Sequence, residues 1–275
     1  MGVGFTEEST SVTVAASAVP ERVVLAARPQ AALRLYCVPP AGAGPDCYLR
    51  WAPLLPPWVE PCSVALPGRG TRAAEPSLTD PAYLSARLAA VLDDWTDPRP
   101  FAVFGHSAGA LLAYEATRHL RRTHGRLPSL LALSSLSAPH LDAYSAGLPP
   151  RLTAGLEGIR ELVGPIPDQL LADARLMAAA CTPLLADCLL LLHYRHRPEP
   201  PLDVPLALYG GEHDPVTSVQ ELQAWNDLVT TPAPTQLFPG GHTYLQTETK
   251  ALVGHLAHTL AGTVDAALDR PVATA

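Results

Sequence analysis

Short apolar segments of the length of a buried β-strand recur along the chain, between turns that contain Pro or Gly. Between these segments, apolar residues recur at the three- and four-residue spacing of a helix with one buried face. Strands that alternate with such helices predict βαβ units, and therefore an α/β fold with a mostly parallel central sheet flanked by helices. We expect strands at 33–38, 58–66, 100–105, 129–137, 204–209 and 234–238, and helices at 84–95, 108–120, 218–229 and 247–268.

Residues 139–200 interrupt this alternation, because they contain several helical patterns and no strand pattern. Pro165, Pro167 and Pro183 are expected to break the segment into separate helices. We interpret it as a helical insertion at about 140–200 that lies over the ligand-binding edge of the sheet.

The first 30 residues are rich in Ser, Thr, Val and Ala and show little periodicity. We interpret residues 1–30 as a poorly ordered N-terminal extension, ordered at most near 22–27. Residues 31–275 are then expected to form a single catalytic domain that carries the helical insertion.

The segment Gly-His-Ser-Ala-Gly at 105–109 follows a predicted strand directly and precedes a predicted helix directly. In that context a Gly-x-Ser-x-Gly sequence predicts a nucleophile elbow, a tight turn that exposes the serine at the sheet edge. The flanking glycines are needed because side chains there would collide with neighbouring backbone. Ser107 is therefore the candidate nucleophile, and the alternative is a Gly-rich turn with no chemical role.

A serine hydroxyl needs a base, and the base needs a carboxylate to orient it. His242 follows the last predicted strand after two glycines, and Asp214 follows the predicted strand 204–209. The order Ser, Asp, His is the order of this fold, and residues after strand ends gather at one edge of the sheet. Asp142, after the strand at 129–137, is the alternative acid.

Hydrolysis at Ser107 also needs amide donors for the negatively charged oxygen of the tetrahedral intermediate. One donor is expected from the backbone of Ala108, the residue after the nucleophile. The second is expected from the loop at 39–44, where small residues let the backbone approach the substrate. The amide of Ala41 is the first candidate in this loop, with that of Gly42 as the alternative.

The composition of the chain argues against several classes of partner and site. Lys and Arg number 19 against 26 Asp and Glu, a net charge of −7, which argues against a nucleic-acid partner. The five cysteines include no CxxC pair, so neither a disulfide framework nor a metal site is expected. No secretory signal and no apolar run near the ~20 residues of a membrane span is apparent. We therefore expect a cytoplasmic protein, with a monomer favoured.

These motifs together resemble the type II editing thioesterases of polyketide and nonribosomal peptide synthesis, which belong to the α/β-hydrolase superfamily. The resemblance covers most of residues 32–246. The segments that carry it, besides 105–109, are Leu-Tyr-Cys-Val-Pro at 35–39, Pro-Gly-Arg-Gly at 67–70, Gly-Gly at 210–211 with Asp214, and Phe-Pro-Gly-Gly-His at 238–242.

The resemblance implies hydrolysis of acyl thioesters from the phosphopantetheine arm of an acyl or peptidyl carrier protein, through an acyl-serine at Ser107. It implies that the insertion is a lid over the acyl channel. No cofactor is expected, because the phosphopantetheine belongs to the carrier protein. Carrier proteins are usually acidic, so Arg69 and Arg72, on a predicted loop near the entrance, are the candidate docking residues.

Two other classes of function use the same residues. A carboxylesterase, lactonase or acyltransferase would share the triad of Ser107, Asp214 and His242, because this fold alone does not select the reaction. A degenerate hydrolase would bind carrier protein without catalysis and would form no covalent adduct with a serine-directed reagent.

Overall fold

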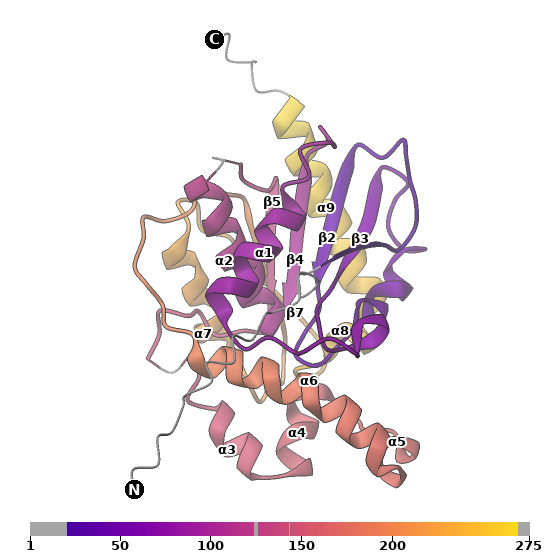
Figure 1. Cartoon of the computed structure of the whole chain (residues 1–275). Helices are drawn as coiled ribbons and strands as arrows, with labels where there is room; N and C mark the ends of the chain where they lie inside the picture. The colour runs from indigo at the N-terminus through magenta and orange to yellow at the C-terminus, as the bar shows by residue number, and fades with distance from the viewer. Residues whose placement is uncertain (1–20, 124–125, 143, 269–275) are drawn as a thin grey trace, which may run out of the picture.

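The computed structural model describes residues 21–123, 126–142 and 144–268 of the chain. Within these residues, seven strands form one sheet in the order β1-β3-β2-β4-β5-β6-β7, and every neighbouring pair is parallel except β1 with β3 (Figure 1). The mostly parallel α/β sheet is therefore confirmed. The strands are β1 (Glu21–Val24), β2 (Leu33–Val38), β3 (Val59–Ala65), β4 (Phe101–His106), β5 (Leu130–Ser134), β6 (Leu206–Gly211) and β7 (Thr235–Phe238).

Strand β1 lies inside the segment that we interpreted as an N-terminal extension. It pairs with β3 from Glu21 opposite Ala65 to Val24 opposite Cys62. Residues 21–24 therefore belong to the sheet, and the catalytic domain begins before residue 31. The rest of the predicted extension, residues 1–20, lies outside the described part of the chain.

Helices cover both faces of the sheet (Figure 1). Successive side chains of β4 point to opposite faces, and both faces are apolar. Phe101 and Val103 belong to one apolar cluster, and Ala102 and Phe104 belong to the other. The first cluster includes residues of α1 (Pro81–Leu92) and α2 (Ala108–Thr123), and the second includes residues of η1 (Pro45–Trp51) and α9 (Thr249–Leu268). The short elements α7 (Val219–Gln223), η3 (Ala224–Leu228) and α8 (Tyr244–Thr247) complete the layers.

Helix α1 begins and ends earlier than its apolar spacing predicts. The Asp80 side chain accepts hydrogen bonds from the amides of Ala82 and Tyr83, and Pro81 occupies the first turn. The helix ends at Leu92, so Trp95, expected on its buried face, is 85% exposed. The capping side chain, which the apolar spacing does not report, set the start of this helix.

The predicted insertion contains α3 (Leu148–Thr153), α4 (Leu156–Val163), α5 (Asp168–Ala172) and α6 (Ala174–His193), which we call the lid. These helices lie together below the sheet in Figure 1, and their residues line a hollow at Ser107 and a second one at residues 41–43. The expected break at Pro183 is wrong, because α6 continues through it. Pro183 is buried, and packing of this part of α6 on the core offsets the lost backbone hydrogen bond.

Helix α6 also corrects the expectation that no apolar segment approaches the length of a membrane span. Its 20 residues are long and apolar enough to cross a membrane by length and composition. In the structure, Leu184, Cys188 and Leu190 of this helix pack in the main apolar cluster, and Asp187 is buried in an ion pair. The apolar character of α6 thus serves packing against the sheet layer.

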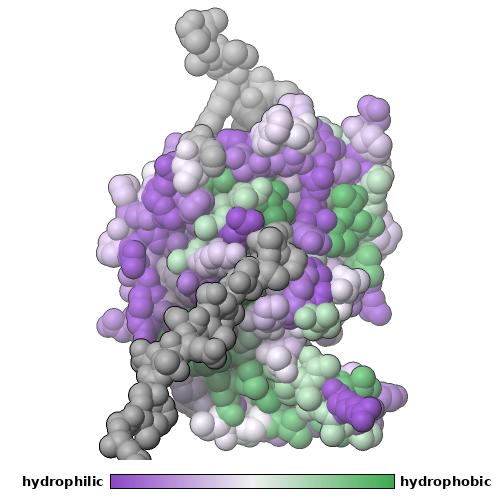
Figure 2. All heavy atoms as spheres, in the orientation of Figure 1, coloured by the Kyte–Doolittle hydropathy of each residue, from purple (hydrophilic) through white to green (hydrophobic). Residues whose placement is uncertain are grey.

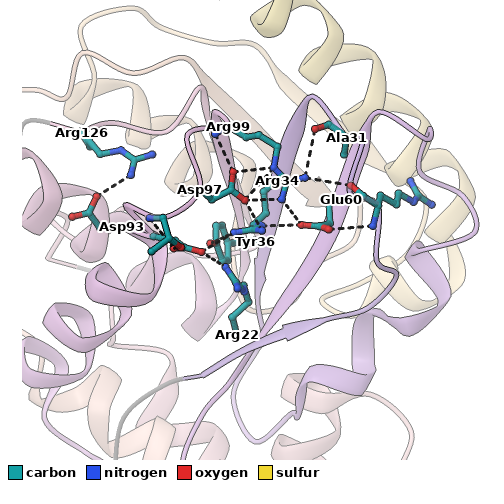
Figure 3. A network of polar contacts seen from close by, with 12 residues as sticks. Arg22, Ala31, Arg34, Tyr36, Glu60, Asp93, Asp97, Arg99 and Arg126 are labelled. Carbon is teal, nitrogen blue, oxygen red and sulfur yellow. Dashed lines mark hydrogen bonds and ion pairs between the residues drawn. The ribbon is translucent and has the colours of Figure 1, made fainter.

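A network of buried and half-buried charges holds the amino ends of β2, β3 and β4 together (Figure 3). Arg34 Nε lies 3.0 Å from Glu60 Oε2, and Arg34 Nη2 lies 2.6 Å from Asp97 Oδ2. Arg99 Nη2 contacts the same two carboxylates, at 2.8 and 2.6 Å. Burial opposes ionisation of Glu60, but the Arg28 amide and the two guanidinium groups outweigh it and lower its pKa.

We expect Glu60→Gln to reduce the free energy of unfolding by about 3 kcal/mol at neutral pH, since it removes one partner from a buried ion pair. The thermal midpoint should fall by roughly 6–12 °C in calorimetry. Because folding lowers the pKa of Glu60, its contribution is complete above about pH 4.3 and is lost as the pH falls through the lowered value. The difference from wild type should therefore shrink in acid.

Glu161→Gln is the matched control, because Glu161 pairs with Arg151 at the surface, where its side chain is 42% exposed. Its effect should stay below about 1 kcal/mol. Equal midpoints for the two variants would contradict the structural role assigned to the buried network.

Candidate active site

Ser107 stands on the tight turn between β4 and α2 with a positive φ of 53°. Its amide donates to the carbonyl of Ser134 at 2.8 Å, which ties the turn to the end of β5. A Cβ on Gly109 would lie 2.3 Å from the carbonyl oxygen of Val38 and 2.6 Å from that of Pro39. The turn therefore packs directly on the loop after β2, and the predicted nucleophile elbow is present.

The structure brings Ser107, His242 and Asp214 together although they lie on three different loops. His242 Nε2 is 3.1 Å from Ser107 Oγ, and His242 Nδ1 is 3.0 Å from Asp214 Oδ2 and 3.1 Å from Oδ1. With the proton on Nδ1 donated to Asp214, Nε2 is free to accept the serine proton. This is the arrangement that activates a serine hydroxyl.

Asp214, and not Asp142, is the carboxylate that orients the histidine. Burial opposes its ionisation, but the hydrogen bond from His242 and the amide of Val216, at 2.8 Å, lower the pKa of Asp214 below its ordinary value. Asp214 therefore stays ionised opposite the imidazole. The alternative acid, Asp142, is exposed at the surface.

A second histidine, His106, lies beside His242 and does not compete with it for the serine proton. His106 is fully buried, and burial together with nearby His242 lowers the pKa of His106 to about 3. Its Nδ1 lies 2.8 Å from Ser134 Oγ, which lies 2.7 Å from the Tyr244 hydroxyl. His106 is therefore neutral, so it adds no positive charge beside the catalytic imidazole.

The loop after β2 contains the predicted second amide of the oxyanion hole. The Gly42 amide already donates to Asp187 Oδ2 at 2.8 Å, so it is occupied. The Ala41 amide has no hydrogen-bond acceptor among the described residues. Ala108 is the first residue of α2, and its amide has no acceptor within the helix. The structure thus favours Ala41 over Gly42 as the partner of Ala108.

The prediction that Arg69 and Arg72 dock a carrier protein is wrong, because each is only 5% exposed. Arg69 forms a bidentate ion pair with Asp187, at 2.5 and 2.9 Å. Arg72 Nη2 lies 2.5 Å from Glu75 Oε2, and its Nη1 donates to the carbonyl of Ala65 at 3.0 Å. Buried, paired guanidinium groups cannot meet a partner surface.

Asp187 is the functional candidate that sequence reasoning missed. It lies in α6 among Leu184, Leu185, Cys188 and Leu189, and it is 3% exposed. A single carboxylate inside an otherwise apolar helical segment is a signal that it has a buried partner. The sequence alone does not say that this partner is Arg69.

Three hollows surround the elbow and the loop after β2. The serine pocket, of about 390 Å³, has walls that include Ser107, Leu136, Tyr144, Leu148, Leu162 and Leu191. The polar groove, of about 370 Å³, has walls that include Asp46, Arg50, His106, Leu162, Thr243 and Gln246. The apolar pocket, of about 220 Å³, has walls that include Ala41, Val163, Ile166, Leu170, Met177 and Leu184.

The apolar residues of the lid divide between these hollows and the surface. Val163, Leu170, Met177 and Leu184 line the apolar pocket, and Leu162 lines the serine pocket and the polar groove. Other lid residues face solvent, and Figure 2 shows apolar residues, in green, over the lower part of the molecule where the lid lies. The exposed ones are Leu156 (44%), Leu176 (50%), Leu185 (46%) and Leu189 (45%).

The fold and the site define a class of protein. A serine on an elbow after a parallel strand, with an acid and a histidine that follow later strands in that order, is the arrangement of α/β hydrolases. A family model described as "Thioesterase domain" matches residues 33–260. The chain therefore belongs to the thioesterase family, and the predicted α/β-hydrolase fold is confirmed.

Individual relatives agree with this assignment. Thioesterase PikA5 of Streptomyces venezuelae is 35% identical over 219 residues, which are 79% of this chain and 77% of that protein. The structure of RedJ, a thioesterase from the prodiginine pathway of Streptomyces coelicolor, has 33% identity and a TM-score of 0.76 over 83% of this chain and 91% of RedJ.

The type II thioesterase BorB, from the borrelidin biosynthetic cluster, has 30% identity and a TM-score of 0.74. The match covers 87% of this chain and 97% of BorB. The resemblance to type II thioesterases stated from the sequence motifs is confirmed.

Proposed function

We propose that this thioesterase hydrolyses acyl groups from the phosphopantetheine arm of acyl or peptidyl carrier proteins in the cytoplasm. It would thereby clear stalled or wrongly primed polyketide or nonribosomal peptide synthases. The observation that carries the proposal is the contact of Ser107 Oγ with His242 Nε2 at 3.1 Å, in a chain of the thioesterase family. The similarity to BorB, a type II thioesterase of a biosynthetic cluster, supports the substrate class.

Acylation follows from the geometry of the three residues. Ser107 Oγ attacks the thioester carbonyl carbon as its proton passes to His242 Nε2, and Asp214 stabilises the resulting imidazolium. The carbonyl oxygen becomes an oxyanion held by the amides of Ala41 and Ala108. When this intermediate collapses, the carbon–sulfur bond breaks and the imidazolium protonates the leaving pantetheine thiolate.

Deacylation uses the same groups with water in place of the thiol. His242 removes a proton from a water molecule, which attacks the acyl-serine carbonyl. The second tetrahedral intermediate releases the free acid as Ser107 recovers its proton from His242. In this sequence His242 transfers each proton, and water supplies the one that replaces the serine proton lost with the thiol. The phosphopantetheine arrives and leaves with the carrier protein.

The positions of the hollows suggest where each part of the substrate binds. The leaving thiol must lie on the side of His242, whose neighbour Thr243 lines the polar groove. We therefore place the phosphopantetheine arm in the polar groove, where the exposed Arg50 is available to its phosphate. The acyl chain then extends into the serine pocket among Leu136, Leu148 and Leu191.

The proposal is tested by comparing two substrates that carry the same acyl chain, one as a carrier-protein thioester and the other as an oxygen ester. Release of acid and free thiol from an acylated carrier protein should exceed cleavage of the oxygen ester of the same chain by at least about tenfold in kcat/KM, since carrier contacts add transition-state binding. A panel of short, branched and aminoacyl groups on the carrier protein would then rank the acyl preference.

Three results would overturn the proposal. Faster turnover of the oxygen ester, by orders of magnitude, would identify a carboxylesterase or lactonase. Transfer of the acyl group to an added amine or alcohol in preference to water would identify an acyltransferase. Bound carrier protein without any covalent adduct at Ser107 would leave only a binding function.

A further inference from the structure

A carboxylate of the lid makes direct contact with the backbone of the loop that carries the oxyanion-hole candidate. Asp187 Oδ2 accepts a hydrogen bond from the Gly42 amide at 2.8 Å, although the two residues lie 145 positions apart. The peptide plane that holds the Gly42 amide meets the plane of the Ala41 amide at Ala41 Cα, so fixing the first limits the rotations open to the second. The conformation of this loop thus depends on a side chain from α6.

Leu184, in the same part of α6, also packs closely against this loop. Gly42 has a φ of +75°, and a Cβ on it would lie 3.0 Å from Leu184 Cβ and 3.2 Å from Leu184 Cα. Only a residue without a side chain fits both this backbone conformation and this approach to the helix. Leu184 and Asp187, one turn apart on α6, therefore hold Gly42 by contact and by hydrogen bond.

The charge of Asp187 is compensated from a third segment. Arg69, in the Pro-Gly-Arg-Gly turn after β3, donates to both of its carboxylate oxygens, at 2.5 and 2.9 Å. The side chains of both partners are 4% exposed. An unpaired carboxylate would be costly at this depth, so the Arg69 guanidinium compensates the buried charge and fixes the orientation of the carboxylate toward Gly42.

We propose that Asp187 is a positioning residue for the oxyanion hole: with Arg69, it holds the Gly42 peptide so that the Ala41 amide faces the developing oxyanion. The inference rests on the proposed acyl-serine reaction at Ser107 and adds that the lid supplies part of the catalytic geometry. Asp187 touches no reacting atom, and it acts through the backbone of residues 41–42.

The experiment compares Asp187→Ala, Asp187→Asn and Arg69→Met with wild type, with an acyl N-acetylcysteamine thioester as substrate so that carrier docking plays no part. We expect Asp187→Ala to lower kcat about 100-fold, the order of effect of one lost oxyanion donor, with KM changed less than about threefold. Asp187→Asn retains an acceptor for the Gly42 amide, so its loss should be smaller, about tenfold.

Affinity for a trifluoromethyl ketone that forms a tetrahedral adduct with Ser107 separates positioning from stability. In the Asp187 variants this affinity should fall in parallel with kcat, because the adduct's oxygen needs the same amides. Glu60→Gln is the control, since it breaks a buried ion pair at the amino ends of the strands, away from the site. It should lower the thermal midpoint and leave kcat and the ketone affinity unchanged.

The outcomes distinguish this inference from the proposed function. Unchanged kcat and ketone affinity in folded Asp187→Asn and Arg69→Met, with a lower thermal midpoint alone, would show a structural ion pair and overturn the inference. Were Asp187→Ala to remain unfolded, these two variants would still decide the question. A wild-type protein that neither hydrolyses the thioester nor forms the Ser107 adduct would instead overturn the proposed function.

Discussion

Replacement of Ser107 by Ala is expected to lower kcat for thioester hydrolysis by about 10⁵–10⁶-fold and to abolish labelling by a serine-directed phosphonate. Ser107 Oγ is the atom that lies against His242 Nε2, so its removal leaves the base with no nucleophile to activate. The remaining turnover should come from direct attack by water, which is still assisted by substrate binding and by the oxyanion amides. The measurement is single-turnover kinetics together with mass spectrometry of the labelled peptide.

His242→Ala provides the control for this result. It should cost nearly as much as Ser107→Ala, and the double variant should be little worse than either single variant, because the residues act as a unit. Both singles should keep wild-type folding within about 1–2 kcal/mol, since each truncates a small part of the core. Additive losses in the double variant, or a phosphonate adduct on another residue, would remove Ser107 from the mechanism.

Asp214→Asn is expected to lower kcat by about 10⁴-fold while KM stays near that of wild type. The asparagine amide would face His242 Nδ1 with a donor, favour the tautomer that places the proton on Nε2, and remove the negative charge that stabilises the imidazolium. Because Asp214 is ionised well below neutrality, the loss should persist across the whole neutral range of pH.

Asp142→Asn is the matched control, as it makes the same chemical change in the other carboxylate considered from the sequence. Asp142 is exposed, and we expect its variant to keep wild-type kcat. Full activity of Asp214→Asn combined with inactivity of Asp142→Asn would transfer the orienting role to Asp142.

The elements that carry the site were predictable because their signals are local. The segment 33–38 forms β2 at the predicted residues, and the elbow at 105–109 lies between a strand and a helix as expected. Their signals are short apolar runs, glycines where the backbone is crowded, and the order of Ser, Asp and His along the chain. Each depends on residues that are neighbours in sequence.

The wrong predictions concern the environment of a residue, which distant segments decide. Arg69 and Arg72 were assigned to a docking surface because they lie on a predicted loop near the entrance, yet both are buried and paired with Asp187 and Glu75. Trp95 was expected on a buried helix face but lies beyond the end of α1. Pro183 was expected to break a helix, but packing against the core outweighs its local preference.

By itself, the sequence determined the alternation of strands and helices, the helical insertion, and the serine, acid and histidine candidates, since periodicity and steric demand act over a few residues. Only the tertiary structure showed that Asp214, and not Asp142, contacts His242, and that the Gly42 amide is occupied by Asp187. It alone joined Arg69 to Asp187 across 118 positions. The physical reason is that ion pairs and close contacts between remote segments exist only after the chain has packed, and no local pattern records which partners will meet.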